Sequence, residues 1–114
     1  MLVVDGDPAV RRVLRLVLEG AGFRCFASET VEDAEAMVAQ VQPKLVLVEV
    51  SPLEQGGFQL AGRLAAGDGW RPRVALMSAY PRPRRGFEDY FLPKPIEFDR
   101  LLELLETIER EQTW

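Results

Sequence analysis

The sequence predicts an α/β protein built on a parallel β-sheet with helices on both faces. Short apolar segments alternate with amphipathic helical segments through the 114 residues, which is the order expected when crossover helices connect parallel strands. One of these segments, Leu45–Val50, is apolar almost without interruption, as expected for a central strand buried on both faces. The length fits a single domain, residues 1–114, with one hydrophobic core.

The first predicted strand is Met1–Val4, a short apolar segment. Asp7 followed by Pro8 is typical of a helix start, because aspartate caps the free N–H groups and proline fits the first helical position. Gly20 and Gly22 predict the end of this helix. Its apolar residues recur at helical spacing: Val10, Val13, Leu14, Val17 and Leu18.

Phe23–Ala27 predicts the second strand. It contains Cys25, the only cysteine, which excludes an internal disulfide and is typical of a small core residue rather than a nucleophile. Thr30 and Asp33 mark the start of the second helix, and Pro43 predicts its end.

In the second half of the chain, Ser51–Gly57 predicts a loop and Phe58–Ala66 a third helix. Arg73–Met77 and Tyr90–Leu92 predict two more strands, and Ile96–Glu109 a last amphipathic helix. The carboxyl ends of parallel strands meet at one edge of a sheet, where we expect the functional site. The residues at these ends are 5–7, 49–51, 78–79 and 93–95.

The composition disfavours several classes of function. There is no histidine, which excludes histidine-based acid–base catalysis and histidine metal sites. The net charge is −4, whereas a general nucleic-acid binder carries a basic face. The glycine-rich phosphate motifs of nucleotide-binding proteins are absent, which disfavours a small nucleotide-binding α/β protein. Without a membrane-spanning apolar segment or a signal-peptide pattern, we expect a cytoplasmic protein that is not an enzyme.

Four segments at the predicted strand ends resemble the landmarks of one known family. These segments are VVDGDPAVRRVL, LVLVEVSPLEQGGF, ALMSA and YFLPKP. They are similar to the landmark segments of response-regulator receiver domains, which belong to two-component signal transduction. The resemblance keeps their order and extends across almost the whole chain. It implies a (βα)5 flavodoxin-like fold, a doubly wound five-stranded parallel sheet with strand order 2-1-3-4-5.

The resemblance also implies a phosphorylation pocket, which this chain keeps only in part. In the family an acidic pair holds a divalent metal; Asp5 matches the first acid, and Gly6 stands where the second belongs. Glu49 stands where the family has its phosphate-accepting aspartate. Ser78 and Lys94 match the hydroxyl and the lysine that contact the phosphoryl group. Two further positions match: Pro95, which follows a cis peptide bond in the family, and Phe91, an aromatic residue near its switch surface.

The departures from the family pattern predict an atypical receiver, or pseudo-receiver. Gly6 removes a direct metal ligand, and Asp7 is one residue further on and committed to capping a helix. Glu49 is longer than aspartate by about 1.3–1.5 Å, and a positioning error near 1 Å can cost about 10²-fold in rate. We therefore expect weak or absent Mg²⁺ binding, no metal site and negligible phosphorylation.

The longer carboxylate of Glu49 suggests a different use of the pocket. It has the reach to meet Lys94 and Ser78, and the hypothesis is a fixed Glu49–Lys94 ion pair that holds the domain in one state. Two alternatives stay open: an inert remnant in which the charges only neutralise each other, and a conventional Mg²⁺-dependent phosphoacceptor. Ser78 has its own alternative, a hydrogen bond to the nearby backbone.

Residues 79–88 depart from the family as well, because the fourth helix normally lies there. Pro81 and Pro83 restrict the backbone, so we expect a loop or at most one turn in its place. The loss of this helix should uncover apolar area on one sheet face, which is typical of an interface. The candidate surface consists of Arg82, Arg84, Arg85, Phe87, Tyr90 and Phe91, with Arg71 and Arg73 nearby.

The arginines of that surface could pair with acidic or phosphate groups of a partner, or simply keep a loop solvated. The sequence thus predicts a phosphorylation-independent interaction module whose partner is another protein or a second copy in a homodimer. It leaves open whether the domain acts alone, in trans or as a piece of a longer protein.

Overall fold

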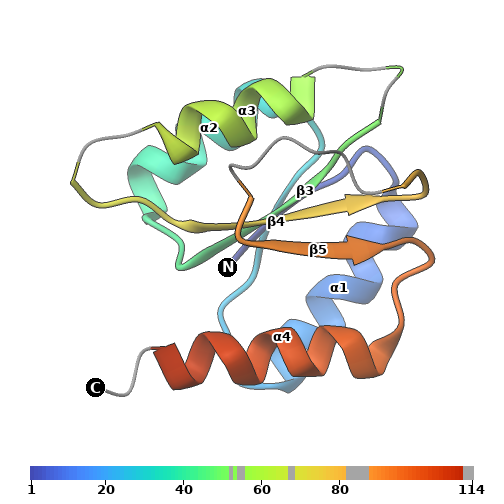
Figure 1. Cartoon of the computed structure of the whole chain (residues 1–114). Helices are drawn as coiled ribbons and strands as arrows, with labels where there is room; N and C mark the ends of the chain where they lie inside the picture. The colour runs from blue at the N-terminus through green and yellow to red at the C-terminus, as the bar shows by residue number, and fades with distance from the viewer. Residues whose placement is uncertain (52, 54–55, 67–68, 82–87, 112–114) are drawn as a thin grey trace.

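The computed structural model describes residues 1–51, 53, 56–66, 69–81 and 88–111. They form one five-stranded sheet in the order β2-β1-β3-β4-β5, with every neighbouring pair parallel. Helices α1 and α4 cover one face, and α2 and α3 cover the other (Figure 1). The predicted fold class and strand order are confirmed. The elements are β1 Leu2–Val4, α1 Pro8–Gly20, β2 Phe26–Ser28, α2 Val31–Val41, β3 Leu45–Glu49, α3 Gly56–Ala65, β4 Arg73–Ser78, β5 Tyr90–Pro93 and α4 Phe98–Glu111.

Both predicted helix starts are confirmed by their capping bonds. The Asp7 carboxylate accepts a hydrogen bond from the Ala9 N–H, with 2.9 Å between Oδ1 and N. The Thr30 hydroxyl accepts one from the Asp33 N–H at 3.2 Å. Each bond satisfies an N–H group that has no partner within its helix.

The second strand begins at Phe26, three residues later than predicted, because Gly22 and Phe23 form the end of α1. Gly22 has a left-handed backbone, with φ of +93°, which glycine adopts without strain. The Phe23 N–H then donates to the carbonyl of Leu18 at 3.0 Å, the pattern that closes a helix after a left-handed residue. Smaller shifts occur at α3, which starts at Gly56, and at α4, which runs from Phe98.

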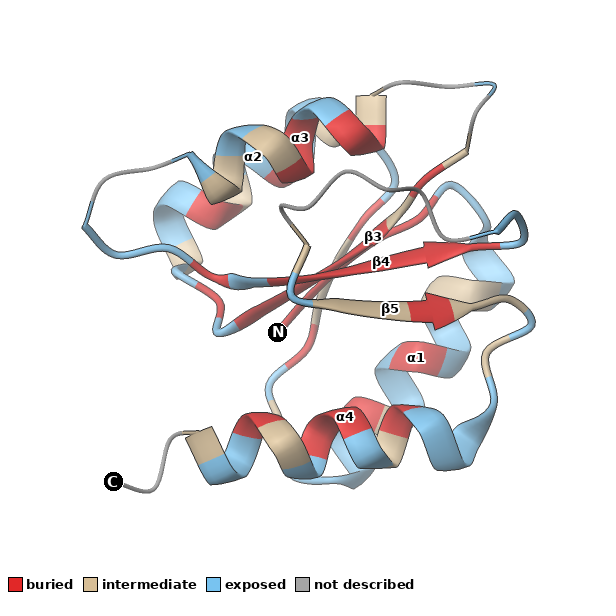
Figure 2. Cartoon of the chain, in the orientation of Figure 1, coloured by how far each residue is buried: buried red, intermediate tan, exposed pale blue. Residues whose placement is uncertain are grey.

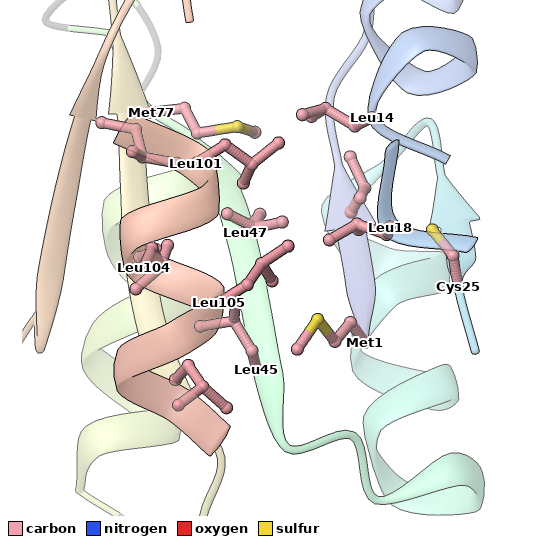
Figure 3. Packing of buried hydrophobic residues seen from close by; sticks show 14 residues of the cluster. Met1, Leu14, Leu18, Cys25, Leu45, Leu47, Met77, Leu101, Leu104 and Leu105 are labelled. Carbon is pink, nitrogen blue, oxygen red and sulfur yellow. The ribbon is translucent and has the colours of Figure 1, made fainter. Parts of the chain in front are cut away.

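The core consists of two clusters, one on each face of the sheet. Alternate residues of a strand point to opposite faces, so Leu45 and Leu47 join the cluster under α1 and α4, whereas Val46 and Val48 join the cluster under α2 and α3. Figure 3 shows Leu47, with Leu14 and Leu18 of α1 and Leu101 of α4 around it (and Met77 of β4). The four β3 residues are fully buried (Figure 2), which confirms that β3 is a central strand.

The connection from β4 to β5 contains no helix within its described residues, 79–81 and 88–89. The expectation of a bare sheet face is wrong for β4. Val74 and Leu76 are 1% and 0% exposed, and they belong to the same buried cluster as Leu60 and Ala61 of α3. The apolar residues of β4 are therefore covered although no helix follows the strand in the described part of the chain.

Candidate functional site

Three of the predicted pocket residues meet at the carboxyl edge of the sheet. Asp5 directly follows β1, Glu49 is the last residue of β3, and Lys94 directly follows β5. The backbone holds these ends in place: the Asp5 N–H donates to the Ser28 carbonyl at 3.1 Å, and the Lys94 N–H donates to the Ser78 carbonyl at 2.7 Å. The peptide bond between Lys94 and the next residue, Pro95, is cis, as the family resemblance implies.

The ammonium group of Lys94 lies between two carboxylates. Its Nζ atom is 2.7 Å from Oδ2 of Asp5 and also donates to Oε2 of Glu49. The Asp5 side chain is fully buried, the Lys94 side chain is 16% exposed, and the Glu49 side chain is 39% exposed. The predicted Glu49–Lys94 ion pair is present, and the structure adds a second and more deeply buried partner, Asp5.

These contacts set the protonation of Lys94. Burial alone lowers the pKa of a lysine, but the hydrogen bonds from Lys94 to Asp5 and Glu49, together with the two negative charges, outweigh it. The pKa of Lys94 is raised above its ordinary value of 10.5. The site therefore holds a permanent cation between two carboxylates at physiological pH.

The other oxygen of Asp5 is also engaged. Its Oδ1 atom accepts a hydrogen bond from the Asp7 N–H at 2.9 Å. The guanidinium of Arg11 donates to the Asp5 backbone carbonyl at 2.7 Å, so a second cation lies beside the site. The Asp7 carboxylate itself caps α1 through Ala9, as predicted.

Gly6 leaves open space where the family has a second acid. A Cβ atom built on Gly6 has no other atom within 4 Å, so a side chain would fit there. A pocket of about 120 Å³ lies beside it. The pocket is lined by Val4, Asp5, Gly6, Glu29, Val31, Glu49, Ser51, Gly56 and Gly57.

The donor set of this pocket does not fit Mg²⁺. This ion requires several oxygen ligands in nearly octahedral geometry, whereas Gly6 supplies no side-chain ligand and each Asp5 carboxylate oxygen already accepts one hydrogen bond. Within the described ranges, no group of three or more histidine, cysteine, aspartate or glutamate residues is placed to hold a metal ion. The ammonium of Lys94 takes the role of counter-cation to Asp5 and Glu49.

Ser78 lies at the end of β4 but points its hydroxyl elsewhere. The side chain is buried, and its Oγ accepts a hydrogen bond from the Tyr80 N–H at 3.0 Å. Among the described residues, no hydrogen bond joins this hydroxyl to Glu49 or to the Lys94 ammonium. The backbone-bonded alternative for Ser78 therefore describes the structure.

Gly57 is a site residue that the sequence patterns did not predict. A Cβ atom on Gly57 would lie 2.3 Å from the carbonyl oxygen of Glu49, closer than any real contact. Only glycine lets the start of α3 pack directly on the end of β3. The available signal was the Gly56–Gly57 pair shortly after the third strand, since a glycine near a site often marks close backbone approach.

The predicted interaction surface is described in part. Arg82, Arg84, Arg85 and Phe87 lie outside the described residues. Tyr90 is half-buried, and its hydroxyl donates to Oε1 of Glu111 at 2.6 Å. Phe91 is also half-buried and packs against the α2–α3 cluster.

The two further arginines near that surface already have partners in the chain. Arg73 forms ion pairs with Asp89 at 3.3 Å and with Glu111 at 3.1 Å. Arg71 donates to the carbonyl of Ala65 at 2.7 Å. Both therefore tie neighbouring elements together.

The comparisons with known proteins relate both the sequence and the fold to response regulators. No family model matches the chain. It is 35% identical over 116 residues to the "uncharacterized 14.6 kDa protein in sodA1 3'region" of Leptolyngbya boryana, covering 93% of this chain and 86% of that protein. It is 26% identical over 119 residues to the transcriptional regulatory protein BtsR of Salmonella typhi, covering 99% of this chain but 49% of BtsR.

Among solved structures, the response regulator TrrA from Thermotoga maritima, in complex with Mg²⁺–BeF, superposes with a TM-score of 0.79 at 25% identity. The match covers 94% of this chain and 96% of that one. The fold and the matched proteins define a signalling domain of two-component systems. Structure neighbours and curated relatives together show a CheY-like response-regulator receiver domain. None of its described helices combines the length and the apolar character of a membrane span.

Proposed function

We propose that this receiver domain works without phosphorylation and is held in one state by the Asp5–Lys94–Glu49 cluster. The observation that carries the proposal is the position of the Lys94 ammonium, which binds both carboxylates. The cluster keeps one positive charge against two negative ones in a largely buried site. A phosphoryl group on Glu49 would add negative charge there, and Gly6 supplies no carboxylate to hold a metal that would balance it.

The missing carboxylate at Gly6 supports the same conclusion. A phosphorylating receiver needs a divalent metal beside the acceptor, because phosphoryl transfer is catalysed mainly by positioning and charge neutralisation. TrrA is known in complex with Mg²⁺–BeF, a metal with a phosphoryl mimic. In this chain each Asp5 carboxylate oxygen already accepts a hydrogen bond, and the neighbouring position, Gly6, carries no side chain.

We propose further that the domain acts by binding another protein on the side formed by β4, β5 and α4. Phe91 is half-buried on β5, and Tyr80 follows β4 with 44% of its surface exposed. Arg82, Arg84, Arg85 and Phe87 belong to the same stretch of sequence. Aromatic and arginine side chains are the residues most enriched where protein interfaces gain their energy.

A titration of the ¹⁵N-labelled chain tests phosphorylation independence. Mg²⁺ is added first and beryllofluoride second, and the amide signals of Asp5, Glu49 and Lys94 are followed by NMR. The expected result is no saturable shift in either step. Saturable shifts at these three residues, or a labile acyl phosphate on Glu49 after incubation with a small phosphodonor, would establish the conventional phosphoacceptor instead.

A variant in which the two missing family features are restored serves as the positive control if the wild type shows no NMR shifts. Gly6→Asp combined with Glu49→Asp returns the two missing features, and the open space at Gly6 admits the new side chain. We expect this variant to bind Mg²⁺ and to respond to beryllofluoride. Gly6→Ser with Glu49→Asp is the matched control, because it fills the same space without a carboxylate and should stay silent.

A further inference from the structure

We propose that the face formed by α1 and α4 binds the same face of a second copy of this chain, with α1 of each copy against α4 of the other. This surface shares α4 with the proposed β4–β5–α4 side, but it uses the edge of α4 that faces α1, and Lys94 of the Asp5–Lys94–Glu49 cluster lines its central pocket. Four features of the described residues support it: exposed apolar side chains, a pocket of side-chain size, unpaired charges and the opposite charge of the two helices.

Three large apolar side chains are exposed on this face. Val13 and Leu16 of α1 are 58% and 68% exposed, and Phe98 at the start of α4 is 57% exposed. Val13 and Leu16 are three residues apart and so lie on one side of α1, away from the buried Leu14 and Leu18. Figure 2 shows α1 and α4 packed under the same sheet face with their exposed sides outward.

The apolar residues border a pocket between the two helices. It has a volume of about 290 Å³ and is lined by Val10, Val13, Val17, Pro95, Ile96 and Phe98, among others. A second hollow, lined by Leu16, Gly20 and Leu102, lies on the other side of Phe98. Pockets for drug-sized ligands begin at about 300 Å³, so an open hollow of this size suits a protruding side chain such as Leu16 or Phe98 of a second copy.

The two helices carry opposite charge. Within α1 there are three arginines and one glutamate, whereas α4 has five acidic residues and two arginines. The outward edge of α1 beside Leu16 carries Arg12, and the corresponding edge of α4 beside Leu102 carries Glu106 and Asp99, as helical spacing places them. Among the described residues, none of these three charges forms an ion pair within the chain.

Charge and symmetry together select the arrangement. A two-fold contact is self-complementary, so each patch meets its counterpart twice. If α1 met α1, arginines would face arginines, and if α4 met α4, acids would face acids, which is unfavourable. Only the exchange of α1 against α4 pairs Arg12 with the acidic edge of α4 and packs the apolar residues in the centre.

The size of the surface sets the expected strength. Two helices about 20 Å long and about 10 Å apart offer a face of roughly 400 Å² per copy, below the roughly 800 Å² of a standard interface. We therefore expect a weak dimer, with a dissociation constant on the order of tens to hundreds of micromolar.

Sedimentation equilibrium of the chain, from low micromolar to near-millimolar concentration, tests the proposal. The expected result is a reversible monomer–dimer equilibrium that Leu16→Glu weakens at least tenfold. Trp70→Glu is the matched control. Trp70 is also a large apolar residue, 50% exposed, but it precedes β4 and belongs to neither α1 nor α4. A chain that stays monomeric throughout, or a dimer that Trp70→Glu weakens as much as Leu16→Glu, would overturn the proposal.

Charge reversal tests the pairing of α1 with α4. Arg12→Glu and Glu106→Arg should each weaken the dimer several-fold, and the double variant should recover most of the loss because the pair is restored with reversed sign. Circular dichroism of each variant shows whether it is folded. Additive losses in the folded double variant would contradict the exchange arrangement. Leu16→Glu should leave the Mg²⁺ and beryllofluoride titration unchanged. Sedimentation therefore tests the dimer, and the NMR titration tests phosphorylation independence, so a failure of one proposal can be told from a failure of the other.

Discussion

The Nζ atom of Lys94 lies 2.7 Å from Oδ2 of Asp5, although the two residues are 89 positions apart in the sequence. Asp5 follows β1 and Lys94 follows β5, and these strands are separated in the sheet by β3 and β4. The lysine side chain therefore reaches across the end of β3, where it also meets Glu49. One ammonium group thus joins the carboxyl ends of three strands.

Replacing Lys94 should destabilise the protein. In Lys94→Ala, two carboxylates remain without their shared cation, and the Asp5 carboxylate is fully buried. We expect a loss of about 2–3 kcal/mol in the free energy of unfolding, between the values for exposed and for buried ion pairs. Urea denaturation measures it. Lys44→Ala is the control, since Lys44 is the other lysine and is exposed; equal stabilities of the two variants would remove the ion-pair hypothesis.

The same cluster predicts how stability depends on pH. The pKa of Lys94 is higher in the folded protein than its ordinary value of 10.5, so the folded state binds this proton more tightly. The stabilisation is complete below pH 10.5 and is lost as the pH rises through the higher folded pKa. Denaturation at several alkaline pH values should show this decline in the wild type and a smaller one in Lys94→Met.

Asp7 should behave as a helix cap and not as a substitute for the missing acid. Asp7→Ala removes the hydrogen bond to the Ala9 N–H and should cost about 1 kcal/mol of stability. Asp7→Asn keeps an oxygen that can accept this bond, so it should cost less. Saturable Mg²⁺ binding by the wild type that Asp7→Asn abolishes, measured by calorimetry, would show instead that the carboxylate serves as a ligand.

Gly57 should tolerate no side chain. In Gly57→Ala the new Cβ would collide with the Glu49 carbonyl oxygen, and because that oxygen is backbone, α3 or β3 must move. We expect a loss of roughly 2–3 kcal/mol, in the range for overpacked sites, and shifted amide signals at Glu49 and Lys94. Gly56→Ala is the matched control, since its Cβ would be 3.3 Å from a Val31 methyl group that can adjust. Equal stability losses in the two variants would contradict the close approach.

Most of the fold could be predicted because it follows from local patterns. Alternating apolar segments and helix caps such as Asp7 and Thr30 act through nearby residues, and the structure confirms them. The error at the second strand has a local cause as well: Phe23 is apolar and resembles a strand residue, but its N–H closes α1 through Leu18. Apolar character alone does not distinguish a strand from the end of a helix.

The candidate site was predictable only in part. The residues at the strand ends could be named from the sequence, and so could the Glu49–Lys94 pair. The contact of Lys94 with Asp5, the bond from Arg11 to the Asp5 carbonyl and the approach of Gly57 could not, because they depend on how distant elements pack. The covered face of β4 could not be predicted for the same reason.

Tyr90 should titrate unusually late. Burial, followed by its hydrogen bond to Glu111 and the charge of that carboxylate, raises the pKa of Tyr90 from 10.0 to about 12. Because the folded pKa is the higher one, the stabilisation from the neutral phenol is complete below pH 10 and is lost between about pH 10 and 12. The chain has two tyrosines, so the ultraviolet absorbance of tyrosinate can follow this step directly.

Three variants assign that late step. Tyr90→Phe should abolish it, and Tyr80→Phe should leave it in place. Glu111→Gln should move it to lower pH without restoring the ordinary value, because the charge is lost but the burial remains. A late step that survives in Tyr90→Phe would mean that the ring of Tyr90 is not held against α4 by Glu111. In that case Tyr90 would be free to take part in the interface proposed for the β4–β5 side.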